Sequence, residues 1–308
     1  MALLYGKGQE RNRLDNKRIL LLGKNGQVGW ELQRALAPLG QLLMHDRTTC
    51  DLADPSALAR TIDNAAPDII VNAAAFTAVD RAEKESAIAY SINAEAVAVM
   101  AKAAAQCSAL FVHYSTDYVF DGSKTEPYVE TDMPNPVSIY GDSKRQGEIA
   151  IVDSGCAHLI FRTSWVFAAR GANFAKTMLR LAGTQDKLRI VADQWGAPTS
   201  AELIADVTAH ALHNARAQHN GLYHLAACGE TSWYEYARFV INRAAELGAT
   251  IKTQTIEPIA TTEYPLPAQR PANSRLSCAK LQATFNLTLP PWQYHVERML
   301  AELICSQS

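Results

Sequence analysis

Short apolar runs alternate with helical patterns through the first half of this 308-residue chain, and no other feature constrains the fold as strongly. Each run has the length and apolar content of a strand, and each intervening pattern has the period of a helix. Ile69, Ile70 and Val71 stand in succession, which is typical of a strand buried on both faces of a parallel sheet. We therefore predict an α/β fold with a doubly wound parallel sheet and helices on both faces. The predicted strands are 18–22, 41–45, 68–72, 110–115 and 158–162.

The helices expected between these strands begin at recognisable signals. One follows a glycine-rich turn and continues through about Pro38. A second begins at Asp54-Pro55, where the carboxylate can cap the first turn and proline suits the first helical position. A long alanine-rich helical region is expected over roughly 82–107, and a further helix carries Tyr140 after a proline-rich entry.

The alternation loosens beyond residue 162, which indicates a change of architecture. We expect residues 17–165 to form the nucleotide-binding domain and residues 166–308 to form mainly a smaller α+β lobe for the substrate. A segment near 193–226 should return to the main sheet, with its strand around 222–225. The first 16 residues are polar and charged after Leu4, so we interpret them as a disordered extension and not as a signal peptide. Helical patterns in the lobe lie near 173–182, 201–214, 233–247 and 291–304.

Charge and cysteine content exclude several classes of protein. The formal net charge of -2 predicts neither nucleic acid nor an anionic membrane surface as a partner. Apolar runs do not reach the ~18 residues of a membrane span. The 6 cysteines are scattered without a Cys-x-x-Cys pair, which is typical of thiols in a reducing cytosol. These features favour a cytoplasmic protein that acts on a small molecule.

Gly23, Gly26 and Gly29 open a helix directly after the first strand. Glycine permits a tight turn and a close approach of backbone N–H groups to a phosphate, and the start of a helix favours an anion. The spacing is G-x-x-G-x-x-G, whereas the usual dinucleotide motif is G-x-G-x-x-G. In this strand–turn–helix context the turn predicts a Rossmann-type domain that binds NAD or NADP. The small residues of Asn72-Ala-Ala-Ala75 leave room for a ligand at the same edge of the sheet.

Two neighbouring residues after the second strand give opposite indications about the cofactor. Asp46 lies where an acid can bind the ribose hydroxyls of NAD. Arg47 could instead receive the 2′-phosphate of NADP. We therefore predict use of both cofactors, with NADPH slightly favoured. Asp51 and Leu52 could flank the adenine.

Tyr140 and Lys144 stand four residues apart, so they share one face if the segment is helical. An ammonium beside a phenol lowers the phenol pKa, and a tyrosine so tuned can act as a general acid or base. Thr116 ends the fourth strand, where its hydroxyl could hold a substrate carbonyl in line with the tyrosine. The three residues behind a glycine turn resemble the extended short-chain dehydrogenase/reductase superfamily.

Longer motifs resemble one branch of that superfamily, the dTDP-4-dehydrorhamnose reductase family, from about residue 17 to residue 303. The family reduces dTDP-4-dehydro-β-L-rhamnose to dTDP-β-L-rhamnose with NADPH or NADH, in a pathway that supplies cell-surface polysaccharide. The motifs are GKNGQVGWELQ (23–33), VNAAAFTAVD (71–80), HYSTDYVFDG (113–122), FRTSW (161–165), DQWGAPT (193–199) and RPANSRL (270–276).

The resemblance implies roles for individual residues. Tyr140 would protonate the carbon-4 oxygen, Lys144 would bind the nicotinamide ribose, and Thr116 would orient the carbonyl. Asn273, Ser274 and Arg275 would meet the nucleotide diphosphate. Further cofactor contacts would come from Gln27, Val28, Ala74, Ala75 and Thr77, and further substrate contacts from Asp117, Tyr118 and Trp165.

The resemblance also implies a homodimer and a magnesium site at the dimer contact, with Glu31, Glu202 and Glu302 as the matching acids. The alternatives are a 4,6-dehydratase or an epimerase of the same superfamily, a related reductase and a regulatory subunit. A 4,6-dehydratase would carry Asp-Glu where this chain has Asp117-Tyr118, so one acid is missing for elimination. A reductase of a different nucleotide-linked 4-ketosugar would use the same motifs. A non-catalytic regulatory subunit can share the fold, but the intact Thr116, Tyr140 and Lys144 favour an enzyme.

Overall fold

The computed structural model describes residues 17–305, and the expectation for residues 1–16 lies outside the described residues. Six parallel strands form the main sheet in the order β10-β5-β4-β3-β1-β2. This confirms the predicted α/β fold with a Rossmann-type parallel sheet. β10 comes from the second half of the chain and lies beside β5. The strands are β1 (Arg18–Leu22), β2 (Gln41–His45), β3 (Ile69–Asn72), β4 (Leu110–Thr116), β5 (His158–Thr163) and β10 (Gly221–His224).

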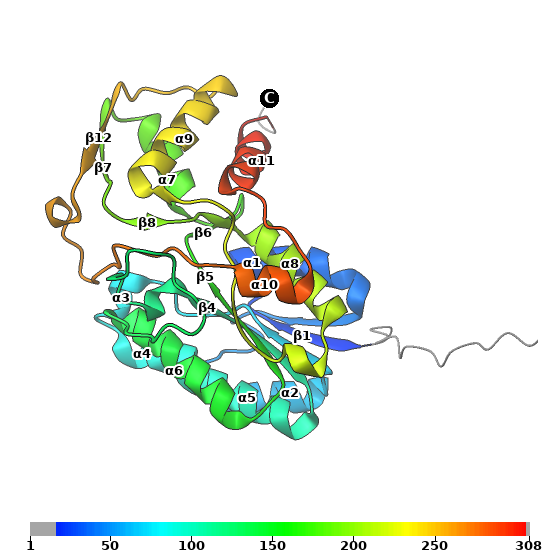
Figure 1. Cartoon of the computed structure of the whole chain (residues 1–308). Helices are drawn as coiled ribbons and strands as arrows, with labels where there is room; N and C mark the ends of the chain where they lie inside the picture. Colours follow the sequence, from blue (N-terminus) through cyan, green and yellow to red (C-terminus); the bar gives the residue numbers. More distant parts are fainter. Residues whose placement is uncertain (1–16, 306–308) are drawn as a thin grey trace, which may run out of the picture.

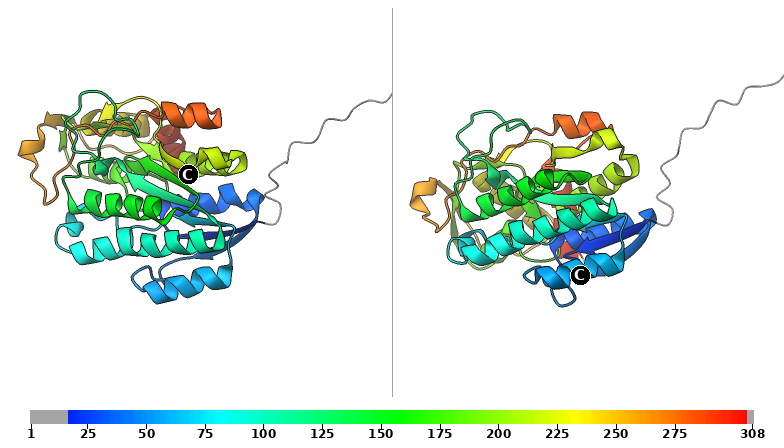
Figure 2. Two further views of the ribbon diagram at one scale, coloured as in Figure 1. Left: turned by 60° about the horizontal axis from the view of Figure 1, so that its bottom comes forward. Right: turned by 90° about the horizontal axis from the view of Figure 1, so that it is seen from below.

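Helices cover both faces of this sheet because alternate side chains of each strand point to opposite faces (Figure 2). Ile19 and Leu21 pack into one buried cluster, with α1 (Gln27–Leu36) and α8 (Ala201–Asn214). Leu20 and Leu22 pack into the other, with helices of the opposite layer. That layer consists of α2 (Pro55–Ala65), α5 (Ala96–Cys107) and α6 (Ile139–Ser154).

The helical region expected over 82–107 is interrupted. It consists of α3 (Val79–Ala82), α4 (Ser86–Tyr90), a π-helical turn η2 (Ser91–Glu95) and then α5. Asn93 in the π turn accepts a hydrogen bond from the backbone N–H of Phe76 and donates to Ser143 Oγ of α6. The wide turn therefore ties the loop after β3 to α6, a contact that helix propensity alone does not predict.

The remaining helices and strands build the C-terminal part, which Figure 1 shows on the side of the molecule opposite α2, α5 and α6. The helices are α7 (Phe174–Ala182), α9 (Trp233–Glu246), α10 (Ala279–Phe285) and α11 (Trp292–Cys305). Short 3-10 turns are η1 (Ala37–Leu39), η3 (Asp117–Val119), η4 (Ala217–His219) and η5 (Thr261–Glu263). The paired short strands are β7 (Lys187–Val191) with β12 (Thr255–Ile259), β8 (Trp195–Gly196) with β11 (Thr231–Ser232), and β6 (Val166–Phe167) with β9 (Thr199–Ser200).

Two features of this part were not predicted. Helix α10 is short and carries no cap signal that would mark its start. Strands β7 and β12 are far apart in the sequence yet pair in parallel. Among residues 17–305, no helix combines the length and the apolar character needed to span a bilayer.

Candidate active site

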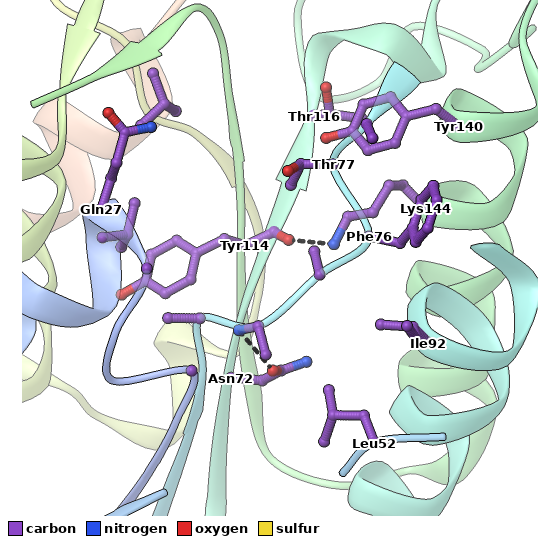
Figure 3. Close-up of a pocket in the computed structure, with 18 of the residues that line it drawn as sticks. Gln27, Leu52, Asn72, Phe76, Thr77, Ile92, Tyr114, Thr116, Tyr140 and Lys144 are labelled. Carbon is purple, nitrogen blue, oxygen red and sulfur yellow. Dashed lines mark hydrogen bonds between the residues drawn. The ribbon is translucent and has the colours of Figure 1, made fainter. Parts of the chain in front are cut away.

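A cavity of 850 Å³ opens at the carboxyl ends of β1, β3 and β4, where the order of strands along the sheet reverses. Ligands of open parallel sheets bind at this position. Figure 3 shows Gln27 on one side of the cavity, and Tyr140 and Lys144 on the other. The predicted site residues in its lining are Gly23, Gly26, Gln27, Val28, Asp46, Arg47, Asp51, Leu52, Ala74, Ala75, Thr77, Thr116, Asp117, Tyr118, Tyr140, Lys144 and Trp165.

The glycine turn lies against the loop after β3. Gly23 has a φ of 84°, and a Cβ there would lie 2.7 Å from the Ala74 nitrogen. A Cβ on Gly29 would lie 2.0 Å from the Gly23 carbonyl oxygen, so glycine at this position allows α1 to pack on the turn. Gly29 itself does not line the cavity. Gly26 caps α1 without a side-chain hydrogen bond. The first N–H groups of α1 therefore receive no bond from a capping side chain, as a phosphate site requires.

Asp46 and Arg47 both line the cavity, but they differ in how they are held. The Asp46 carboxylate accepts hydrogen bonds from Asn25 Nδ2 at 2.9 Å and from Thr48 Oγ1 at 2.6 Å. The Thr48 bonds and the nearby Lys24 hold the pKa of Asp46 well below its usual range. The Arg47 side chain is 82% exposed, and its ion pair with Asp51 is long, at 3.7 Å. The acid is therefore fixed, whereas the guanidinium is free to turn toward a ligand.

Tyr140 and Thr116 meet at the other side of the cavity. The Ser138 hydroxyl caps the helix that carries Tyr140 by accepting from the backbone N–H of Gly141. The Tyr140 ring lies beside the side chain of Thr116, which ends β4 (Figure 3). The Thr116 hydroxyl is the side-chain hydrogen-bond partner of the phenol. Burial raises the pKa of Tyr140 to about 12, the bond to Thr116 lowers it, and the charge of Asp117 raises it. The phenol is thus fully protonated at neutral pH.

Lys144 shares the helix face of Tyr140, but its ammonium group points elsewhere. Lys144 Nζ donates to the carbonyl oxygen of Tyr114 at 2.7 Å and lies 3.1 Å from His113 Nε2. The side chain of Asn72 holds the other ring nitrogen of His113 at 3.2 Å. Our prediction that Lys144 lowers the pKa of Tyr140 is therefore wrong for this structure, because the lysine is bound to β4. The pKa of Lys144 itself is lowered to about 8 by burial, against the charge of Glu148.

The resemblance implies that Lys144 binds the nicotinamide ribose, and on that basis we expect cofactor binding to depend on pH through this residue. Its ammonium loses a proton as pH rises through about 8, and a neutral amine no longer attracts an anionic dinucleotide. We expect the dissociation constant for NADPH to increase between neutral pH and about pH 9.5, measured by quenching of protein fluorescence. The Lys144→Met variant should bind more weakly and without this pH dependence. Equal pH profiles for the two proteins would contradict the role of Lys144.

Asp117 is a buried carboxyl beside the reacting groups. Its Oδ1 accepts from Thr116 Oγ1 at 3.1 Å, and the Ser274 side chain is a further partner. Its Oδ2 is buried with no hydrogen-bond partner. Burial raises the pKa of Asp117 to about 6, although the bonds from Ser274 and Thr116 lower it. An unpaired buried oxygen in the cavity lining is available to accept a bond from a ligand hydroxyl.

The raised pKa of Asp117 has a consequence for stability. Below pH 3.8, the ordinary pKa of the carboxyl, Asp117 is protonated in both the native and the unfolded state, and the protein is most stable with respect to this group. As pH rises to about 6, the unfolded state releases the proton more readily than the native state does, so the free energy of unfolding falls. The charged form then costs the native state up to about 3 kcal/mol. We expect Asp117→Asn to be more stable than the wild type. The gain in the free energy of unfolding should be about 1 kcal/mol larger at pH 8 than at pH 5. Urea unfolding of both proteins at pH 5 and at pH 8 measures this gain. Asp63→Asn, at an exposed position, is the control. A gain in stability that is the same at both pH values would contradict the role of the Asp117 charge.

Trp165 lines the cavity as expected, but the predicted diphosphate contacts lie outside its lining. The Asn273 amide donates to the carbonyl oxygens of Lys124 and Glu126. The Arg275 guanidinium pairs with Glu230 at 2.9 Å. The role of these residues at the diphosphate therefore stays a prediction.

The three predicted metal ligands approach one another on α1, α8 and α11. Burial raises the pKa of Glu31, Arg34 lowers it, and the charges of Glu202 and Glu302 raise it again. Both oxygens of Glu202 accept bonds from Arg298, at 2.8 and 3.2 Å. In the part of the chain from 17 to 305, no cluster of three His, Cys, Asp or Glu side chains forms a metal site. This arrangement does not support the predicted magnesium site.

Two functional positions escaped the sequence analysis. Trp233 lines the cavity from the first turn of α9, and His113 contacts Lys144 from inside β4. No spacing rule links Trp233 to the glycine turn. The signal for His113 was a polar residue directly after the apolar run Leu110, Phe111 and Val112 of the same strand.

The fold and the cavity define a Rossmann-type protein of the extended short-chain dehydrogenase/reductase class. Residues 17–305 match the family model described as the RmlD substrate binding domain. The chain is 52% identical over 291 residues to the dTDP-4-dehydrorhamnose reductase of Escherichia coli K12, covering 92% of this chain and 97% of that protein. This chain therefore belongs to the dTDP-4-dehydrorhamnose reductase family, a family of oxidoreductases.

Other family members agree with this assignment. The dTDP-4-dehydrorhamnose reductase of Burkholderia thailandensis is 50% identical, covering 93% of this chain and 99% of that protein. A solved structure of the Bacillus anthracis dTDP-4-dehydrorhamnose reductase in complex with NADP superposes with a TM-score of 0.86 at 34% identity. That comparison covers 93% of this chain and 99% of the other.

Proposed function

We propose that the protein reduces the 4-keto group of dTDP-4-dehydro-β-L-rhamnose to give dTDP-β-L-rhamnose, with NADPH or NADH as reductant. The observation that carries this proposal is the pair of Thr116 and Tyr140 in a cavity that also contains the glycine turn. The names of the relatives that cover almost the whole chain support the same reaction. We also propose that it works in the cytoplasm, where a nucleotide sugar would be the small-molecule substrate.

The residues around the glycine turn fit a dinucleotide. The first turn of α1, which follows Gly26, would present backbone N–H groups to the diphosphate. Leu52 would lie against the adenine, and Lys144 would hold the nicotinamide ribose. When bound, the reduced nicotinamide supplies the hydride that reaches carbon 4. The cocrystallised NADP of the Bacillus anthracis relative supports a nicotinamide cofactor here.

The chain itself would supply the proton. On substrate binding the Thr116 hydroxyl would turn from Asp117 Oδ1 to donate its hydrogen bond to the carbonyl oxygen, and so keep that oxygen next to the Tyr140 hydroxyl. As the hydride arrives at carbon 4, the Tyr140 O–H bond breaks and its proton moves to the carbonyl oxygen, which becomes the new hydroxyl. A phenol with a pKa near 12 carries that proton at neutral pH, as a reduction requires. Asp117 Oδ2 would accept a bond from a neighbouring sugar hydroxyl.

We propose that both cofactors are used, with NADPH favoured. Asp46 would accept the ribose hydroxyls of NADH, but its carboxylate is already bonded to Asn25 and Thr48. The exposed Arg47 would pair with the 2′-phosphate of NADPH.

Purified protein offered several nucleotide-linked 4-ketosugars, each with NADPH and with NADH, tests the proposal. Consumption of reduced cofactor should be fastest with dTDP-4-dehydro-β-L-rhamnose, and NMR should identify the product as dTDP-β-L-rhamnose. A faster reaction with another 4-ketosugar would identify a different reductase. No turnover with any of them, together with binding to a partner enzyme, would indicate a regulatory subunit.

A further inference from the structure

Trp165 adopts a backbone conformation that large side chains rarely take. Its φ is +48°, in the left-handed region, although it is neither glycine nor asparagine. Such conformations persist only when the surrounding structure holds them, and they gather at functional sites. The carbonyl oxygen of Trp165 accepts a bond from the Thr199 N–H at 3.3 Å, and the neighbouring Ser164 hydroxyl donates to the Ala197 carbonyl at 3.0 Å. The segment 197–199 therefore fixes the backbone of this turn.

The indole of Trp165 is held separately, by Trp233. The two rings are stacked with centroids 3.5 Å apart and an angle of 14° between their planes. Both line the cavity, yet they come from segments far apart in the sequence, the turn after β5 and the start of α9. Stacked aromatic pairs contribute beyond the area they bury, so each ring restricts the other.

Gly196 leaves the space that the Trp165 indole occupies. A Cβ added at Gly196 would lie 2.6 Å from Trp165 Cε2 and 2.9 Å from Trp165 Cζ2. Gly196 has no left-handed φ, so its backbone conformation is open to alanine as well. The need for glycine at this position therefore comes from the Trp165 ring and not from the backbone.

Trp233 is in turn anchored on the side away from the cavity. Its Nε1 donates to Oε1 of the buried Gln194 at 3.2 Å, and Gln194 Nε2 donates to Thr261 Oγ1 at 3.1 Å. Phe174 packs against the Trp233 ring with centroids 4.5 Å apart. The position of the Trp233 ring is thus set by contacts within the C-terminal part of the chain, independently of a ligand.

We propose that Trp233 is a positioning residue for substrate binding, which together with Gly196 holds the Trp165 indole as a preformed apolar wall for the sugar. This inference rests on the proposed function, because it assigns the wall to the deoxysugar of that substrate. Gly196 lies over one face of the Trp165 indole and Trp233 over the other, so the wall offers the sugar the apolar edge of the stacked pair. A ring fixed before binding loses little conformational entropy when the sugar arrives. The wall therefore acts on sugar binding and not on the cofactor.

Two variants disturb the wall by independent routes. Trp233→Leu removes the stacking partner, and Gly196→Ala drives a methyl group into the Trp165 indole. For each we expect the KM for the nucleotide sugar to rise about tenfold, while the KM for NADPH stays within about twofold and kcat changes less than the sugar KM. Trp233→Phe keeps an aromatic partner and should restore most of the sugar affinity. Phe239→Leu is the matched control, since Phe239 lies in the same helix, packs on Trp292 and does not line the cavity, so its sugar KM should stay within about twofold of the wild type.

A spectroscopic readout accompanies the kinetics. Two stacked indoles give an exciton couplet in circular dichroism, which Trp233→Leu should abolish and Gly196→Ala should weaken. If the wild type reduces the sugar but both variants keep its KM within about twofold, the inference is wrong and the proposed function stands. An inactive wild type would instead refute the proposed function. If Trp233→Leu does not fold, Gly196→Ala and Trp233→Phe decide the matter by the same comparison.

Discussion

Replacement of Tyr140 by phenylalanine is expected to reduce kcat by about 10²-fold or more. The variant keeps the ring, whose edge packs on Tyr118 with centroids 5.6 Å apart, and loses only the hydroxyl that is bonded to Thr116. The dissociation constant for NADPH should therefore stay close to that of the wild type. Stopped-flow measurement of a single turnover, with cofactor binding measured separately, distinguishes the two effects.

Tyr114→Phe is the matched control for this prediction. The Tyr114 ring also lines the cavity, but its hydroxyl is bonded to Thr208 Oγ1 at 2.8 Å and is not assigned a proton-transfer role. We expect its kcat to fall by only a few-fold. Near-normal turnover of Tyr140→Phe, or an equal loss in both variants, would remove Tyr140 from the role of proton donor.

The second large effect concerns stability. Glu148 and Arg162 form a buried ion pair between α6 and β5, with two bonds of 2.8 and 2.6 Å. The Glu148 side chain is fully buried and that of Arg162 is 2% exposed. Arg162→Met leaves the buried Glu148 carboxylate paired with Arg145, whose side chain is 30% exposed. Because a partly exposed partner compensates a buried charge incompletely, we expect the free energy of unfolding to fall by about 3 kcal/mol. Denaturant unfolding measures this directly.

A double-mutant cycle separates this pair from general damage to the core. Glu148→Gln with Arg162→Met removes both charges and should recover much of the stability lost in Arg162→Met. The surface pair of Arg298 and Glu202 is the control, because the Arg298 side chain is 54% exposed and its removal should cost no more than about 1 kcal/mol. If the double variant loses as much free energy of unfolding as the two single variants together, the two residues are not energetically coupled. Glu148 lies one turn after Lys144, so the pair also fixes the helix that carries Tyr140 and Lys144.

The main sheet and the glycine turn could be predicted because their signals are local. A buried strand is visible as consecutive apolar residues such as Ile69 and Ile70, and the turn as Gly23 and Gly26. The cap at Asp54 was predicted for the same reason, and its carboxylate accepts from the N–H groups of Ser56 and Ala57. These features depend on the residue and its immediate neighbours.

The parts that escaped prediction depend on contacts between distant segments. The spacing of Tyr140 and Lys144 placed both on one helix face, but it could not show that the backbone carbonyl of Tyr114 captures the lysine. The π turn at Asn93 is similarly set by bonds to Phe76 and Ser143. Trp233 enters the cavity only because α9 packs beside the turn after β5, which no local pattern encodes.

The proposed reaction transfers a hydride to carbon 4 of the sugar, and Tyr140 supplies the matching proton. NADPH deuterated at the transferred position of its nicotinamide, incubated with the enzyme and dTDP-4-dehydro-β-L-rhamnose, tests that claim most directly. Mass spectrometry and NMR of the product should find one deuterium, bound to carbon 4 of dTDP-β-L-rhamnose. Product without deuterium, or with the deuterium on another carbon, would contradict the account.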